Sequence, residues 1–169
     1  MLAEQYQISY DEMGRELTMM KKFCLVLAAL VICMTACAAA QEIEIHVNDQ
    51  VLIAELADNS SAEALAELLA RGPVTIDMHD FSNFEKVGEL PESLPTNDED
   101  ITTEACDLIL YLGHRFVIYY DTNSWDFTRL GRIISVTGEE LREILGDGDV
   151  TVVLSLPEET EETEEMPGT

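Results

Sequence analysis

The feature that most constrains the fold of this chain is a series of short segments in which apolar and polar residues alternate. Residues 42–47 read Glu-Ile-Glu-Ile-His-Val, and residues 74–79 and 149–156 follow a similar pattern. A period of two places the apolar side chains of such a segment on one face of a β-strand. Turn-forming residues separate the segments, so hairpins are expected between them. The sequence therefore predicts a mainly β domain.

Further strands and two helices complete this prediction. Residues 42–57 fit one hairpin, residues 107–120 fit a second that turns at Gly113-His114, and residues 125–134 fit a strand pair or one bent strand. Ser60 and Thr137 each precede a Glu by three residues, which is the capping-box spacing, and helix-spaced leucines follow both. Many short strands with two isolated helices indicate a closed antiparallel barrel.

Residues 81–104 differ from the rest because they contain turn-formers and carboxylates but no long periodic run. Two aromatic residues, Phe81 and Phe84, open the segment and favour an ordered conformation. Long irregular segments within a compact domain are usually functional or disordered. We expect this segment to be irregular and to contribute to a site.

Residues 20–40 have the pattern of a signal peptide. Met20-Lys21-Lys22 precedes an apolar run, and small residues follow it up to Ala40. Two processing routes stay open, because residues 34–37 resemble a lipobox that would lipidate Cys37, whereas Ala38-Ala39-Ala40 fits ordinary signal peptidase. We therefore expect an exported protein, either a cell-surface lipoprotein or a secreted or periplasmic one.

The acidic residues 1–19 do not fit this signal pattern. They favour a start codon assigned too early, with synthesis beginning at Met20 or Met19. The alternative is a genuine cytosolic extension that turns the apolar run into an anchor.

The net charge of −25 limits the kinds of partner that this chain can bind. Residues 38–156 carry 6 basic and 24 acidic side chains, and residues 157–169 add six Glu, which predicts a disordered acidic tail. Phosphate contacts need clustered Lys and Arg, so a nucleic-acid partner is not expected. An acidic surface is also repelled by anionic lipid headgroups, so membrane residence would depend on a lipid at Cys37. We expect a monomer.

No motif for a metal or cofactor stands out. His46, His79 and His114 are too far apart in sequence for ligand spacing, and there is no dinucleotide, Walker A or nucleophile-elbow motif. Within residues 42–156, Cys106 is the only thiol, and a small buried residue at the start of a strand is its expected role. We expect neither a metal nor a cofactor.

Several blocks in order resemble a bacterial cyclophilin-like family over residues 42–156. They are residues 56–62, 84–88, 94–98, 107–111, 123–125 and 128–133. The resemblance implies a closed cyclophilin-type barrel of about eight strands with two short helices. It also implies a domain that is sometimes fused to flavodoxin-like modules. The family usually has Pro-Gly where this chain has Ala105-Cys106, so the following strand is expected to begin with a gentler bend.

The resemblance raises prolyl isomerisation as an activity, since true cyclophilins hold an X-Pro bond against an apolar wall and an arginine donor. They carry a Phe-x-x-Gln-Gly-Gly-Asp-Phe block, whereas this chain has only Asp126-Phe127-Thr128 without the glycines. A non-catalytic module that binds an extended peptide or small ligand is therefore favoured. A peptidyl-prolyl isomerase that uses Arg129 is the alternative, and an accessory partner of a flavodoxin-like redox protein is a second one.

The proposed ligand-binding residues gather around the irregular segment and one turn. Phe84 and Trp125 would form the walls, Tyr120 and Arg129 the polar contacts, and Asn123 and Ser124 the hydrogen bonds of a turn. Considered alone, each of these large aromatic residues is more often part of a hydrophobic core than of a ligand-binding wall.

Overall fold

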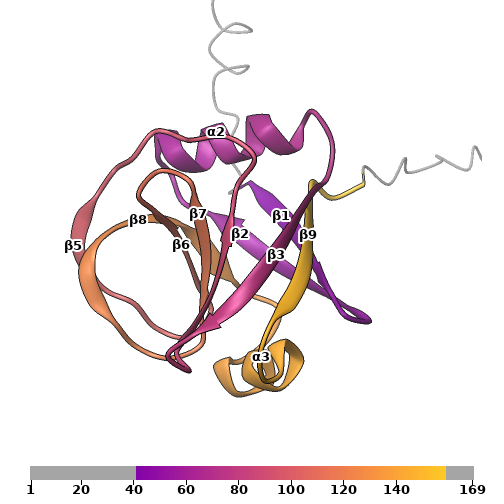
Figure 1. Cartoon of the computed structure of the whole chain (residues 1–169). Coiled ribbons are helices and arrows are strands. Elements are labelled where there is room, and N and C mark those ends of the chain that lie inside the picture. Colours follow the sequence, from indigo (N-terminus) through magenta and orange to yellow (C-terminus); the bar gives the residue numbers. More distant parts are fainter. Residues whose placement is uncertain (1–40, 159–169) are drawn as a thin grey trace, which may run out of the picture. The chain divides into compact units, whose positions relative to one another are not determined.

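The structure is a computed structural model that describes residues 41–158 (Figure 1). Residues 1–40 and 159–169 lie outside the described residues. The predicted signal peptide, the lipid site at Cys37 and most of the acidic tail therefore stay predictions.

Nine strands and two helices make up residues 41–158. In chain order they are β1 (Glu42–Val47), β2 (Gln50–Leu56), α2 (Ser60–Leu69), β3 (Val74–Phe81), β4 (Glu85–Glu89), β5 (Glu99–Thr102), β6 (Asp107–Tyr111), β7 (Arg115–Tyr119), β8 (Ser124–Ile133), α3 (Gly138–Leu145) and β9 (Val150–Ser155). Their order in the sheet is β2-β1-β9-β3-β4-β7-β6-β8, and β2 also pairs with β8. Eight antiparallel strands thus close a barrel, while β5 pairs with the first half of β8 outside this ring. The predicted mainly β barrel with two helices is confirmed.

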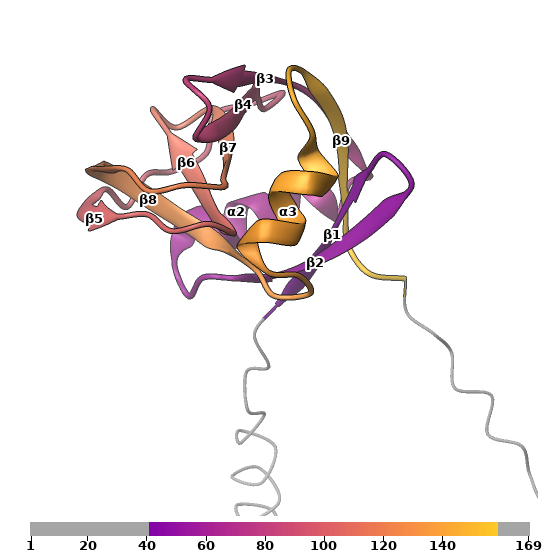
Figure 2. The same ribbon diagram turned by 90° about the horizontal axis from the view of Figure 1, so that it is seen from below.

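Alternate residues of the strands fill the barrel. Ile43, Ile45 and Val47 of β1 are all buried in the main core, as the period of two predicted. Helix α2 covers one end of the barrel and α3 covers the other (Figures 1 and 2). Each helix places leucines in the same core. Among the described residues, no helix is long and apolar enough to cross a bilayer.

The two helix starts test the capping predictions. At α3 the Thr137 hydroxyl accepts from the Glu140 amide at 3.3 Å, and the Glu140 carboxylate accepts from the Thr137 amide at 2.8 Å, so the capping box is confirmed. At α2 the prediction is wrong by one residue, because Asn59 is the N-cap and its side-chain oxygen accepts from the Ser61 and Ala62 amides.

The segment expected to be irregular contains two strands, β4 and β5. The prediction fails at β4 because Glu85, Lys86, Val87 and Gly88 are all buried, so the strand shows no alternation of polar and apolar residues. Lys86 points into the barrel, where its ammonium group is hydrogen-bonded. Gly88 permits close packing, since a Cβ there would lie 2.3 Å from the side chain of Ile76.

The gentler bend expected before β6 does not occur. Cys106 has a φ of 80°, in the left-handed region that favours glycine. Its amide donates to the Tyr119 carbonyl and its carbonyl accepts from the Ile133 amide, so hydrogen bonds to two neighbouring segments impose this conformation. The thiol is buried, as predicted.

Residues 124–133 form one bent strand, β8. Its pairing with β6 shifts register, because Leu108 lies opposite Gly131 whereas Ile109 lies opposite Arg129. Such a bulge kinks a strand and redirects its side chains. Gly131 is required at the kink, since a Cβ there would lie 2.3 Å from the Glu55 carbonyl oxygen of β2. The bulge therefore separates the part of β8 that closes the barrel from the part that pairs with β5.

Candidate functional site

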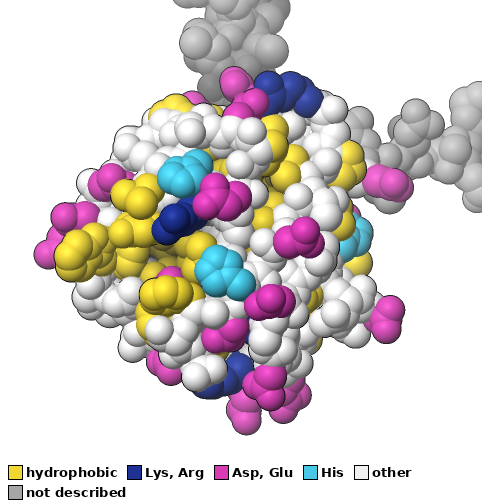
Figure 3. All heavy atoms as spheres, viewed as in Figure 1, with side chains coloured by type: hydrophobic (Ala, Val, Ile, Leu, Met, Phe, Trp, Pro, Cys, Tyr) yellow, Lys and Arg dark blue, Asp and Glu magenta, His cyan; other side chains and the backbone are white. Residues whose placement is uncertain are grey.

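A pocket of about 440 Å³ lies on the outer face of the sheet formed by β3, β4, β7, β6 and β8. Every second residue of a strand points away from the barrel interior, and here these residues form a second hydrophobic cluster, separate from the main core. The residues that line the pocket are Asp77, His79, Phe81, Phe84, Glu85, Val87, Gly88, Glu89, Tyr111, Arg115, Val117, Tyr119, Asn123, Trp125 and Phe127. Figure 3 shows hydrophobic side chains gathered around a hollow, with histidines and a basic side chain beside them.

Five aromatic rings form a continuous row along this pocket. Phe84 stacks on Tyr119 with the ring centroids 6.1 Å apart, and Tyr119 lies 5.8 Å from Phe127. Phe81 and Tyr111 extend the row at its two ends. Tyr119 and Phe127 are buried within the row, whereas Phe81 is exposed and Phe84 and Tyr111 are partly exposed. Aromatic rings that border a pocket suit an apolar group or a cation, because the ring faces carry partial negative charge.

Trp125 stands at the rim and is 62% exposed. It is the single tryptophan of the chain. Its fluorescence can therefore report on the pocket without interference.

A buried carboxyl group lies between the rings. Glu85 is 9% exposed, and its register partner on β7 is Tyr119. Its Oε2 atom has no hydrogen-bond partner among the residues that the structure describes. Burial raises the pKa of Glu85, while the Tyr119 hydroxyl and the His79 ring act in the opposite direction. Burial also raises the pKa of Tyr119, which keeps the phenol protonated.

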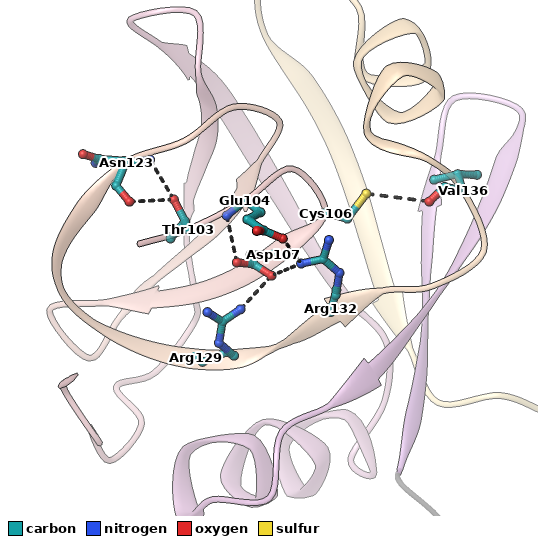
Figure 4. A network of polar contacts seen from close by, with 8 residues as sticks. All are labelled: Thr103, Glu104, Cys106, Asp107, Asn123, Arg129, Arg132 and Val136. Atoms are coloured by element: carbon teal, nitrogen blue, oxygen red, sulfur yellow. Dashed lines mark hydrogen bonds and ion pairs between the residues drawn. The ribbon is translucent and has the colours of Figure 1, made fainter. Parts of the chain in front are cut away.

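Three other polar groups of the pocket, Asn123, Asp77 and Glu89, have partners. The Asn123 amide nitrogen lies 3.3 Å from the Tyr119 hydroxyl and donates to it. The buried Thr103 hydroxyl fixes the Asn123 backbone, donating to its carbonyl at 3.1 Å and accepting from its amide at 3.0 Å (Figure 4). The Asp77 carboxylate accepts from the Thr151 hydroxyl at 2.7 Å.

The Glu89 carboxylate at the rim lies 3.5 Å from the Arg115 guanidinium. It also lies 3.7 Å from His114. The charge of Glu89 thus faces two basic side chains, whereas the Tyr119 hydroxyl and the His79 ring are the groups that favour the charged form of Glu85.

The pocket includes three of the six residues predicted for the site. Phe84, Asn123 and Trp125 line it, and ligand binding by them stays a prediction. Tyr120 does not line it, since its ring packs in the main core and its hydroxyl donates to Asp80 at 2.5 Å. Ser124 does not line it either, because its hydroxyl pairs with Thr102 across β5 and β8.

Arg129 is the third predicted residue that does not line the pocket. Its guanidinium lies 2.6 Å from the Asp107 carboxylate, which is 1% exposed. Arg132 lies 2.7 Å from the same oxygen, and the Glu104 amide donates to the other one (Figure 4). The bulge in β8 brings both arginines to one carboxylate, which the alternation of the sequence did not reveal.

Sequence reasoning did not identify Glu85 and Tyr119 as site residues. One signal could have identified the region, because β6 and β7 are apolar on both faces. Strands of this kind are covered on both sides or border a pocket, whereas a strand at a solvated surface alternates. Glu85 itself carries no such signal, because a carboxylate at a strand start is typical of a surface.

Metal binding has no candidate among residues 41–158, where no three His, Cys, Asp or Glu side chains are placed to hold an ion.

Glu85→Gln is expected to raise the free energy of unfolding at pH 7 by about 1 kcal/mol, because an unpartnered buried group costs stability, and an ionised one costs more than a neutral one. The pKa of Glu85 is raised in the folded state, so the protonated form stabilises the fold below the ordinary value of 4.5, and this contribution is lost as pH rises through the raised pKa. The gain in the variant should therefore shrink below about pH 4.5. Urea unfolding of both proteins at the two pH values measures it.

The exposed Glu89→Gln is the control and should change stability by less than about 0.5 kcal/mol. A Glu85→Gln protein that is less stable at pH 7 would show that the carboxylate supports the fold.

Comparison with known proteins supplies the family. The model of the cyclophilin-like family matches residues 45–155. No curated protein matches the chain. Among solved structures, the solution structure of the hypothetical protein AF2241 from Archaeoglobus fulgidus is similar, with a TM-score of 0.52 and 14% identity over 73% of this chain and 100% of that one. At this identity the likeness shows the fold alone. Because the family match spans more than half of its residues, the chain belongs to the cyclophilin-like family.

Proposed function

We propose that this protein is an exported, non-catalytic binding module that holds an extended peptide or a small ligand in the outer pocket. The observation that carries the proposal is the pocket itself, with its aromatic row and an unpartnered carboxyl oxygen beside it. Small-molecule sites have about 300–1,000 Å³, are mostly apolar and contain a few polar groups, and this pocket has those properties. Export rests on the signal-like pattern of residues 20–40.

Two further features support binding at this face. Phe81 and Trp125 are 51% and 62% exposed on the pocket wall, and large aromatic residues left exposed together mark interaction sites. The hydrogen bonds of Thr103 hold Asn123 in place, so the wall is formed before a ligand arrives. A preformed site loses less conformational entropy on binding.

The isomerase alternative depended on Arg129 as the donor. Because that guanidinium is paired with Asp107 and does not line the pocket, we assign it no role in the chemistry. The flavodoxin-like redox partner stays a prediction from the resemblance.

Titration of the purified protein with the neutral peptide acetyl-Ala-Ala-Pro-Phe-amide tests the proposal. We expect a saturable change in Trp125 fluorescence and NMR shifts that gather at Phe84, Tyr119 and Asn123. Phe84→Ala should weaken binding about tenfold, since a half-buried aromatic wall contributes on the order of 1–2 kcal/mol. Ile134→Ala removes an exposed apolar side chain that does not line the pocket and should leave the affinity unchanged.

The proposal would be overturned if neutral, acidic and basic peptides all left Trp125 and the pocket resonances unchanged. Shifts centred on Asp107 and Arg129 instead would place the site elsewhere on the barrel.

A further inference from the structure

We infer that the pocket selects an organic cation, a protonated amine or guanidinium on an apolar body, and that Glu85 pairs with its charge. The basic side chain or the amino terminus of a peptide has this chemistry. The inference rests on the proposed function, because it names the ligand class of the same pocket.

The first argument is the state of the Glu85 carboxylate. The residue lines the pocket and is nine-tenths buried, yet Oε2 has no partner among the described residues. A buried carboxylate is costly unless hydrogen bonds or an opposite charge compensate it. The other two pocket carboxylates have such partners, Thr151 for Asp77 and Arg115 for Glu89. Glu85 is therefore the pocket carboxylate with a buried oxygen that lacks a partner, although the Tyr119 hydroxyl and the His79 ring favour its charged form. A ligand with N–H donors would add an opposite charge beside it.

The second argument is the surface that surrounds Glu85. Tyr119 lies opposite it on β7, Phe81 lies opposite it on β3, and Phe84 precedes it in the chain. Phe84 and Tyr119 stack with an interplanar angle of 19°, and Phe84 is the more exposed of the two rings. A cation that pairs with Glu85 would lie against ring faces, which attract positive charge most strongly where water is excluded.

The third argument is the field of the domain. Residues 38–156 carry 24 acidic and 6 basic side chains, and such an excess raises the local concentration of cations and lowers that of anions. Among the described residues that line the pocket, Arg115 is the one Lys or Arg. Its guanidinium lies 3.5 Å from the Glu89 carboxylate. Its charge is thus offset at the rim, and the pocket does not favour an anion.

Three probes of the same shape separate charge from apolar contact. They are 2-phenylethylammonium, the neutral 2-phenylethanol and the anionic phenylacetate, each titrated into the full chain with Trp125 fluorescence and NMR shifts as readouts. We expect the cation to bind at least about tenfold more tightly than the alcohol, because an ion pair and ring contacts in a partly desolvated site add to the apolar contact.

Two variants with the same change in net charge show whether the preference for the cation depends on Glu85. In Glu85→Gln the preference for the cation over the alcohol should fall to within about twofold, whereas Glu143→Gln, an exposed position on α3 that does not line the pocket, should keep most of it. Thermal unfolding of both variants establishes that they fold. A preference that survives in Glu85→Gln would overturn the assignment to Glu85.

The outcomes also separate this inference from the proposed function. If all three probes bind with equal affinity and shift the pocket resonances, the cation class is wrong and the binding module stands. Tighter binding of phenylacetate would make Arg115 the anchor and overturn the inference likewise. If no probe and no peptide reaches the pocket, both proposals fail.

Discussion

Lys86→Met should lower the free energy of unfolding by about 3–5 kcal/mol, because it breaks a buried ion pair by removing one partner. Lys86 is fully buried, and its ammonium group donates to the Asp80 carboxylate at 2.9 Å and to the carbonyls of Gly146 and Gly148 at 2.9 and 2.6 Å. Methionine has a similar stem but no donors. It therefore removes the cation that pairs with Asp80, which keeps the Tyr120 hydroxyl as a donor, and takes the ammonium donor from two carbonyls while filling most of the same space.

The pH dependence adds a second observable. The Tyr120 hydroxyl and Lys86 hold the pKa of Asp80 below its ordinary value of 3.8. A lowered pKa means that the ion pair stabilises the fold above the unfolded value and that this contribution is lost as pH falls through the folded one. The difference in stability between the two proteins should therefore narrow below about pH 3.8.

Urea unfolding at pH 7 measures the effect, with Arg71→Met as the control. Arg71 forms an exposed ion pair with Glu92, and removing such a pair costs at most about 1 kcal/mol. Equal losses in the two variants would contradict the role of Lys86.

Asp107→Ala should cost about 3 kcal/mol, since the carboxylate is 1% exposed and compensates two guanidinium groups. It also accepts from the Glu104 amide at the start of β6, so the substitution removes a turn hydrogen bond as well. Arg129→Ala should cost only about 1 kcal/mol, because its side chain is 38% exposed and Arg132 remains paired with Asp107.

The ordering of these two losses tests whether Arg129 is structural. Both are measured by urea unfolding, and the affinity of the pocket for 2-phenylethylammonium is measured beside them. We expect Arg129→Ala to leave that affinity unchanged. Loss of binding in a folded Arg129→Ala protein would show that Arg129 contributes to the site, and the isomerase would again be a candidate function.

The predictions from sequence succeeded where local patterns decide the structure. The alternation of residues 42–47 and 150–155 matches strands β1 and β9, and the Thr137 capping box begins α3. Such patterns depend on side chains within a few residues of one another, which the sequence contains directly. The many short strands with two isolated helices already indicated a closed barrel, and the resemblance to the cyclophilin-like family supplied its type and its number of about eight strands.

The predictions from sequence failed where contacts between residues far apart in the chain determine the local structure. Strand β4 was missed because Lys86 is buried by Asp80, Gly146 and Gly148, and the last two lie about sixty residues away. Cys106 keeps a conformation that favours glycine because hydrogen bonds to Tyr119 and Ile133 hold it. A short stretch of sequence gives no information about contacts between residues this far apart.

The candidate site likewise contains residues that the sequence predicted and residues that only the structure revealed. Phe84, Asn123 and Trp125 could be proposed from sequence, because aromatic residues and a turn within one region suggest a pocket. Arg129 was assigned to the pocket because it is close in sequence to Trp125 and Phe127, but in the structure it pairs with Asp107 and does not line the pocket. Glu85 became a candidate only when pairing with β7 placed it opposite Tyr119.

The sequence by itself thus determined a β domain with two helices, an acidic surface and the aromatic residues available to a site. Tertiary structure alone decided which charged groups are compensated. Lys86, Asp107 and Arg129 found partners across the fold, whereas Glu85 Oε2 was left without one beside a row of rings. The physical reason is that burial sets the energy of a charge, and burial depends on strands that meet only when the barrel closes.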